Sequence, residues 1–104
     1  MIVRKKKELV MAKYNPSMTL TERRIFEFAI YKWQIGDQSF RKIDLEEVFG
    51  NIGTKKIQES AEKLNDISFS IEEDEIIEKP IFNDISYLNG VISFEWSDYI
   101  KQYI

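Results

Sequence analysis

The residues of this 104-residue chain best suited to chemistry are five basic residues and one glutamine, and they occur in two groups. One group lies in segment 55–66, and the other is a pair of adjacent arginines. Together they are Lys55, Lys56, Gln58, Lys63, Arg23 and Arg24. Lysine and arginine bind phosphate oxygens and glutamine can read base edges, so these residues are candidates for contact with double-stranded DNA. Two simpler interpretations stay open: the lysines solvate a helix surface, and one of the arginines pairs with Glu27.

The charge of the chain is unevenly distributed. The net charge is −3, but residues 1–43 hold ten Lys and Arg against four Asp and Glu, whereas residues 67–104 hold two against eight. We therefore expect one basic face and one acidic face, and the basic face would attract an anionic partner.

The composition excludes most familiar catalysis. The chain has no cysteine and no histidine, which excludes a disulfide, a thiol nucleophile, a zinc-thiolate site and a serine–histidine triad. The acidic residues 72–75 and Glu78 lack the spacing and the glycine of a calcium loop, and there is no glycine-rich phosphate loop. We expect no enzyme activity, no cofactor and no metal.

No segment is apolar for long enough to span a membrane. The longest uninterrupted apolar run is residues 9–12, against the roughly 18 residues that a span needs. This run is also too short for the apolar part of a signal peptide. We expect a cytoplasmic protein.

The elements that position the basic residues begin with a long helix over residues 19–35. Thr19 is a good N-cap, and Glu22 can reach back to the amide of the cap, which completes a capping box. An apolar stripe then recurs at the helical period. It consists of Ile25, Phe26, Ala29, Ile30 and Trp33, with Phe28 beside it.

Two short helices follow a short predicted strand at residues 40–43. Asp44 is expected to cap the first helix, which ends at Gly50, and Thr54 to cap the second, which covers residues 55–66. The inward face of the second helix consists of Ile57, Ala61 and Leu64. Two helices joined by a glycine-bearing turn are typical of a helix-turn-helix, whose second helix can enter the DNA major groove, although any helical hairpin fits this pattern.

The second half of the chain is predicted to be β structure. Residues 67–71 alternate apolar and polar, and residues 76–82 continue as a strand in which Pro80 favours an edge position. Asn89-Gly90 is typical of a two-residue type I′ hairpin turn. This turn pairs Leu88 with Val91, Tyr87 with Ile92 and Ile85 with Phe94. The apolar face of the hairpin then consists of Ile85, Tyr87, Ile92, Phe94 and Trp96.

This order of elements predicts an α+β fold of the winged-helix type, in which a helix-turn-helix packs against an antiparallel hairpin that forms the wing. Residues 1–104 form a single domain in this interpretation. Ser97 is expected to cap a last helix from Asp98 to Ile104. Because the apolar stripe of that helix stops within its second turn, we expect the domain to be part of a longer protein.

Two stretches resemble the N-terminal domain of iteron-type plasmid replication initiator proteins, which contain two winged-helix domains in tandem. The first is ELVMAKY at residues 8–14 followed by MTLTERRIF at residues 18–26, similar to the opening of that family. The second is ISYLNGVISFEWS at residues 85–97, similar to the hairpin and serine that close the family's first domain. The resemblance covers nearly the whole chain.

The resemblance implies a bacterial, non-enzymatic protein that initiates plasmid DNA replication by binding repeated sites at an origin. In such proteins the second domain, absent here, does most of the base-specific reading. The first domain makes accessory DNA contacts and forms a homodimer, and host replication proteins are further candidate partners. Glu59 and Glu62 lie on the helix that would enter the groove and repel phosphate, which favours a weak contact.

A strand edge is the expected dimer surface, because unpaired backbone groups can extend the sheet of a partner. The candidate residues come from the strands at 67–71 and 76–82. They are Ile67, Phe69, Ile71, Ile76 and Ile77. Two alternatives stay open: a protein-interaction module of the same fold, and a transcriptional regulator that is complete as a small protein.

Overall fold

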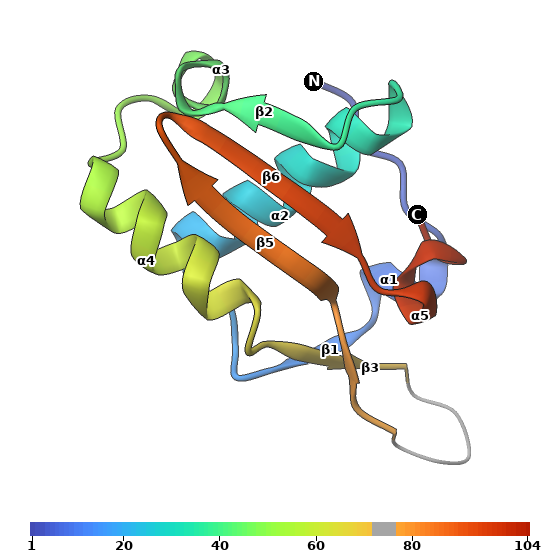
Figure 1. Cartoon of the computed structure of the whole chain (residues 1–104). Helices are drawn as coiled ribbons and strands as arrows, with labels where there is room; N and C mark the ends of the chain where they lie inside the picture. Colours follow the sequence, from blue (N-terminus) through green and yellow to red (C-terminus); the bar gives the residue numbers. More distant parts are fainter. Residues whose placement is uncertain (72–76) are drawn as a thin grey trace.

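The computed structural model describes residues 1–71 and 77–104. The helices are α1 (Lys7–Val10), α2 (Leu20–Gln34), α3 (Lys42–Phe49), α4 (Thr54–Leu64) and α5 (Asp98–Lys101). The strands are β1 (Lys13–Asn15), β2 (Ser39–Arg41), β3 (Ser68–Ser70), β4 (Lys79–Pro80), β5 (Phe82–Leu88) and β6 (Val91–Trp96). The sheet of β2, β6 and β5 lies over α2, and α4 runs beside β5 (Figure 1). From α2 to β6 the order is that of a winged helix, so the predicted α+β fold is confirmed.

Helix α2 begins where the capping box predicts. Thr19 Oγ1 accepts a hydrogen bond from the Glu22 backbone N–H at 3.2 Å, and the Thr19 N–H donates to Glu22 Oε1 at 3.3 Å. The Thr19 hydroxyl also donates to Glu22 Oε2 at 2.8 Å. The cap therefore provides the hydrogen bonds that the buried Glu22 carboxylate needs. The predicted apolar stripe faces the core, with Trp33 half-buried at its margin.

Helix α3 begins at Lys42, earlier than predicted, and shortens the expected strand at 40–43 to β2. Asp44 is not the cap. It occupies the third position of the helix, where its Oδ2 accepts from the Arg41 backbone N–H at 3.2 Å and its Oδ1 from the Arg41 guanidinium at 2.8 Å. A carboxylate in the first turn also suits the helix dipole. The helix ends at Gly50 as predicted, with a φ of 88° that favours glycine.

Glu46 closes the turn between α3 and α4. Its Oε2 accepts from the Ile52 backbone N–H at 2.9 Å, and its Oε1 accepts from Lys42 Nζ at 3.0 Å. The Ile52 amide first, and then Lys42, hold the pKa of Glu46 below its ordinary value. Helix α4 begins at Thr54 itself, and Gly53 takes the cap position predicted for Thr54. The inward residues Ile57, Ala61 and Leu64 are buried as predicted.

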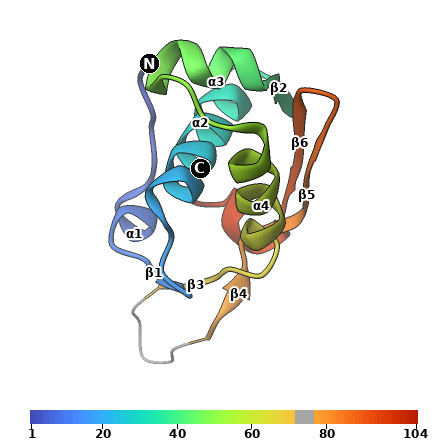
Figure 2. The same cartoon turned by 90° about the vertical axis from the view of Figure 1, so that its left-hand side faces the viewer.

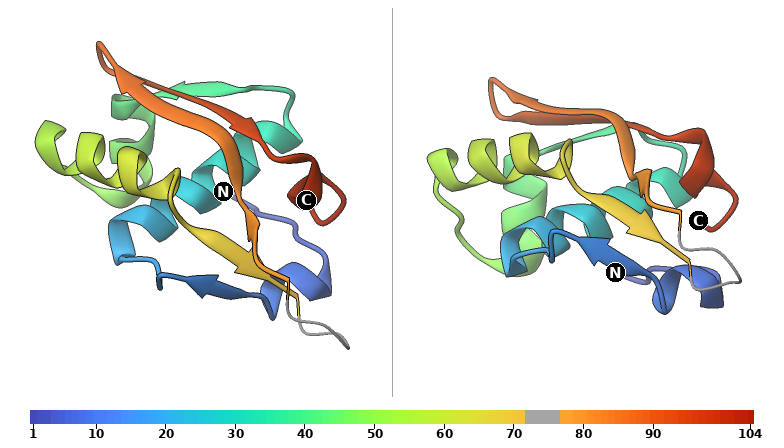
Figure 3. Two further views of the ribbon diagram at one scale, coloured as in Figure 1. Left: turned by 60° about the horizontal axis from the view of Figure 1, so that its bottom comes forward. Right: turned by 90° about the horizontal axis from the view of Figure 1, so that it is seen from below.

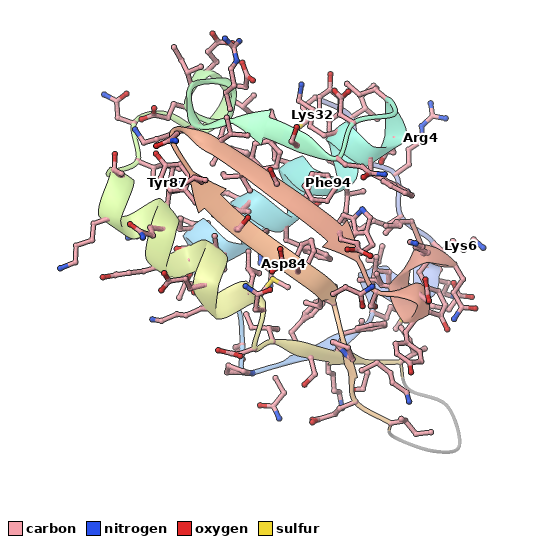
Figure 4. The ribbon with its side chains drawn as sticks, viewed as in Figure 1. Arg4, Lys6, Lys32, Asp84, Tyr87 and Phe94 are labelled. Atoms are coloured by element: carbon pink, nitrogen blue, oxygen red, sulfur yellow. The ribbon has the colours of Figure 1, made fainter. Side chains whose placement is uncertain are left out.

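Strands β5 and β6 form the predicted hairpin. Asn89 and Gly90 have φ angles of 50° and 80°, as a type I′ turn requires. All three predicted pairs across the hairpin are present. The predicted apolar face is buried except for Tyr87, which is half-buried, while Asp84 on the opposite face is exposed. Figure 4 allows Asp84, Tyr87 and Phe94 to be followed along the hairpin.

A second sheet, which the sequence pattern does not predict, joins β1, β3 and β4 in that order. Lys13 pairs with Ser70 and Asn15 pairs with Ser68, so the N-terminal segment lies beside the strand that follows α4 (Figure 3). This pairing holds the start of the chain against the same body as the helix-turn-helix.

The two strands predicted at 67–71 and 76–82 are both shorter than expected. Strand β3 covers three residues and β4 covers two. Pro80 lies in the edge strand of its sheet, as its missing N–H predicts. Ile76, the first residue of the strand predicted at 76–82, lies outside the described residues.

An aromatic cluster beneath the hairpin forms the centre of the core. Trp96 stacks on Phe82 with ring centroids 4.6 Å apart, and it contacts Phe94 at 5.4 Å and Phe26 at 5.9 Å. All four rings are buried. Because burying one such side chain is worth about 1.5–3 kcal/mol, these contacts hold the hairpin against α2.

The N-terminal arm and α5 are tied to the body at the end of the hairpin opposite its turn. The Arg4 backbone N–H donates to Gln34 Oε1 at 2.7 Å, and the Lys6 N–H donates to the Tyr103 carbonyl at 3.0 Å. Arg4 and Lys6 are labelled in Figure 4. Ser97 caps α5 as predicted, although the helix ends at Lys101 rather than at the last residue. Among the described residues, none of the helices could cross a membrane.

Candidate nucleic-acid interface

Helix α4 exposes its polar residues because its apolar residues repeat on the opposite side. The apolar side packs against α2 and β5. The four predicted site residues on this helix are all exposed, namely Lys55, Lys56, Gln58 and Lys63. They therefore lie on the accessible side of the second helix of the helix-turn-helix, which Figure 2 shows from the front.

The charges of α4 change sign along the helix. Lys55 and Lys56 lie in its first turn, exposed Glu59 and Glu62 follow in the middle, and Lys63 lies near the end. Lys55 Nζ is 3.9 Å from Glu59 Oε1, and the Lys55 side chain is 91% exposed. A pair this exposed contributes little, so it does not prevent Lys55 from binding phosphate. The N-terminal end is the part of α4 best suited to an anion.

The backbone of α4 adds to this basic end. Gly53, the cap residue, has no side chain that could accept from the first amides, and the first turn contains no acidic residue. The free N–H groups and the positive end of the helix dipole therefore face outward without compensation. Such a helix start favours phosphate oxygens.

The two adjacent arginines of α2 diverge, because successive residues of a helix are about 100° apart. The Arg24 guanidinium lies 5.4 Å from the centre of the Phe49 ring. Arg24 and Lys56 line one pocket, whereas Arg23 lines a separate hollow beside β1. Among the described residues neither arginine pairs with an acid, and Glu27 instead binds Lys5 of the N-terminal arm. The alternative pairing with Glu27 is therefore wrong.

The pocket between α2 and α4 also contains residues that the sequence analysis misses. It has a volume of about 240 Å³, and Thr21 and Asn51 line it together with Arg24 and Lys56. Thr21 comes from the first turn of α2 and Asn51 from the loop before α4, far apart in the sequence. No local spacing signals their proximity, although the strong cap of α2 does mark where its first turn begins.

The turn of the hairpin wing is attached to α3. The Lys42 backbone N–H donates to the Gly90 carbonyl at 2.8 Å. Arg41, another basic residue that the sequence analysis does not select, lies beside this turn and is bound to Asp44. Hydrogen bonding from Arg41 holds the pKa of Asp44 below its ordinary value. The turn of the wing is therefore joined to the first helix of the helix-turn-helix by a backbone hydrogen bond.

The predicted dimer residues lie in different environments. Ile67 and Phe69 are 1% and 3% exposed, and β3 is hydrogen-bonded on both sides, to β1 and β4. Strand β3 has no free edge, so the expectation that it extends a partner's sheet is wrong. Ile71 is half-buried, Ile77 is 51% exposed just before edge strand β4, and Ile76 lies outside the described residues.

Strand β5 is also an edge strand, but Asn65 covers part of it. Asn65 Nδ2 donates to the Ile85 carbonyl at 2.7 Å, and its Oδ1 accepts from the Ile85 N–H at 2.9 Å. The side-chain amide thereby takes the place of a neighbouring strand at this position. Of the two strands predicted as dimer edges, only β4 lacks a neighbouring strand on one side, and there Ser97 Oγ donates to the Pro80 carbonyl at 2.7 Å.

Comparison with known proteins identifies the family. The family model described as "Initiator Replication protein, WH1" matches residues 2–104, almost the entire chain. No curated protein matches it. The family is a DNA-binding family rather than a catalytic one, and its members bind origin DNA. The chain belongs to this family and is the N-terminal winged-helix domain of a plasmid replication initiator.

Proposed function

We propose that this domain makes accessory contacts to duplex DNA and mediates self-association within an origin-binding initiator. A second winged-helix domain would then carry most of the base-specific reading, and host replication proteins would be further partners. The initiator would act in the bacterial cytoplasm, where plasmid DNA is located.

The basic, uncapped start of α4 is the observation that carries the DNA contact. Lys55 and Lys56 are exposed there, and the free amides of the same turn add positive potential. Gln58 lies one turn further and Lys63 near the end of the helix. Arg24 extends the basic surface onto α2, whereas Arg23 adds positive charge beside β1. Glu59 and Glu62 oppose phosphate in the middle of the helix, so the contact is weak and centred on the first turn.

A salt titration of duplex binding tests this contact. Affinity for a short fluorescent duplex should fall as salt rises, by about 0.9 log units per log unit of salt for each phosphate neutralised. Lys55→Glu should weaken binding and make the slope shallower. Lys101→Glu is the matched control, since Lys101 is also an exposed lysine paired with one acid of its own helix. Equal effects of the two substitutions, or no binding at low salt, would remove the DNA contact.

The same titration separates the domain from a pure protein-interaction module of the same fold. Replacing both Lys55 and Lys56 by glutamate should leave the binding of such a module to its protein partner unchanged. The same replacement should remove the affinity of a DNA-contacting domain for the duplex. No observation on this chain favours the module or a self-sufficient regulator over an initiator domain.

The edge at β4 is the surface that we propose for self-association. Ile77 is 51% exposed at this edge, and a hollow of about 220 Å³ beside it has apolar and aromatic walls that include Ile71 and Tyr99. An exposed apolar side chain beside this hollow suits burial against a second copy. Strand β4 adds little backbone pairing, since Pro80 has no N–H and its carbonyl already accepts from Ser97 Oγ at 2.7 Å.

Sedimentation over a range of concentrations tests the dimer. The wild-type chain should dimerise, and Ile77→Glu should shift it to monomer. Ile35→Glu is the control, because Ile35 is 56% exposed at the end of α2, away from β4. A wild-type chain that is strictly monomeric, or an Ile77→Glu variant that dimerises normally, contradicts the assignment.

A further inference from the structure

The pocket between the starts of α2 and α4 combines two helix N-termini. Its walls include the cap and first turn of α2, the loop residues 51–53 before α4, and Lys56 of the first turn of α4. Helix α2 has fifteen residues and α4 has eleven, so both have a substantial dipole. The start of α4 is not neutralised, since no side chain caps it and no acid lies in its first turn.

Thr21 adds a hydrogen-bond donor to the pocket. Its side chain lines the pocket and only 6% of the residue is exposed, yet its hydroxyl has no hydrogen-bond partner within residues 1–71 and 77–104. Among the described residues Trp96 Nε1 is the enclosed side-chain polar atom without a partner, so solvent reaches the Thr21 hydroxyl, which is free to donate to an acceptor in the pocket. The neighbouring Thr19 hydroxyl does not share this role, because it is already bound to Glu22.

The charges around the pocket select an anion. Arg24 stacks on Phe49, and neither Arg24 nor Lys56 pairs with an acid in the described part of the chain. The one carboxylate in the first turn of α2, Glu22, is bound to the backbone and hydroxyl of Thr19. The ligand is therefore anionic and accepts several hydrogen bonds, which are the properties of a phosphate group.

We propose that this pocket binds one phosphate group of the DNA backbone. The Thr21 hydroxyl and the first amides of α4 donate to its oxygens, while Arg24 and Lys56 neutralise its charge. The inference rests on the proposed DNA contact and deepens it. A phosphate held here fixes the start of α4 against the duplex and keeps Glu59 and Glu62 away from that phosphate.

Titration with inorganic phosphate tests the pocket without DNA. Backbone amide spectra of the 104-residue chain are recorded with increasing phosphate, against sodium chloride at equal ionic strength. We expect phosphate-specific changes at Thr21 and at residues 53–56, which weaken in Thr21→Val. Changes spread over all basic surfaces, or none at the pocket, would overturn the proposal.

Duplex binding by four variants tests whether the phosphate belongs to DNA. Thr21→Val keeps the shape but removes the hydroxyl and should weaken binding about tenfold, as expected for a hydrogen bond to a charged group, with an unchanged salt slope. Thr21→Ser should retain binding. Lys56→Gln should weaken binding more than Lys63→Gln, the same charge change at the other end of α4. Thermal melting checks that each variant is folded.

The outcomes separate this inference from the DNA contact itself. If wild type binds duplex but Thr21→Val binds equally well, the pocket proposal fails and the wider contact stands. If wild type does not bind duplex at all, the proposed function fails. Phosphate-specific changes in that case assign the pocket to free phosphate and overturn the DNA source.

Discussion

Replacing Asn65 with alanine removes the connection between the end of α4 and the edge of β5. The Asn65 side chain makes two hydrogen bonds to the Ile85 backbone, at 2.7 and 2.9 Å, and a longer one to the Ala61 carbonyl at 3.4 Å. Ile85 itself is 1% exposed. The substitution therefore leaves one backbone N–H and one carbonyl without their partner at the edge of the sheet.

The expected loss follows from these bonds. Each short hydrogen bond contributes about 0.5–1.5 kcal/mol, and a backbone group left unsatisfied costs about 1–3 kcal/mol. The substitution leaves two backbone groups without their partner. Because Asn65 is exposed and water can reach its position, we expect each group to cost about 1 kcal/mol, the lower end of its range, and the variant to lose about 2 kcal/mol in total. In a domain of this size such a loss lowers the melting temperature by about 10 °C.

Urea denaturation followed by tryptophan fluorescence measures this change, since Trp96 is buried in the core. Asn83→Ala is the matched control. Asn83 lies on β5 itself, but its side chain makes only one exposed hydrogen bond, to Glu95 at 3.3 Å, so its loss should stay within about 0.5 kcal/mol. An Asn65→Ala variant as stable as this control would refute the role of Asn65 at the edge.

Three further predictions concern the elements that position the interface. Thr19→Ala should lose about 1 kcal/mol of unfolding free energy, and an unchanged urea midpoint would contradict the capping role. Gly90→Ala should lose about 1–2 kcal/mol because its φ is 80°. Gly53→Ala, at negative φ and with open space around it, should lose less, with only the poorer cap residue to account for a loss. The lowered pKa values of Asp44 and Glu46 stabilise the fold above the ordinary carboxyl range, and this contribution disappears as pH falls through the folded-state pKa values. Stability measured against pH should therefore fall on the acid side, less steeply in Glu46→Gln, and an equal slope would argue against the bond to the loop.

The long helix and the hairpin could be predicted because their signals are local. Thr19 and Glu22 are three residues apart, and Asn89-Gly90 determines by its own backbone preference the register of five residue pairs, up to the irregularity between Phe82 and Asp84. The start of α3 could not be placed in the same way. Asp44 suits both a cap and the third position of a helix, and only the bond from Arg41 distinguishes the two.

The pairings between distant segments could not be predicted. Strand β1 has three residues and pairs with β3 more than fifty residues away, so no periodicity reveals it. For that reason the pattern at residues 67–71 predicts a free edge that β3 does not have. The candidate lysines were found because they lie on the polar side of a periodic helix. That Arg24 and not Arg23 lies beside Lys56 depends on how α2 packs against α4, which the sequence does not reveal.

The central claim is that the first turn of α4 is the part of this domain that contacts DNA. Mapping amide chemical-shift changes of the chain on addition of a short duplex at low salt tests it most directly. We predict the largest changes at residues 53–58 and at Thr21, and none in α5. Changes centred on α5, or on the outer face of the hairpin around Asp84, would contradict the account.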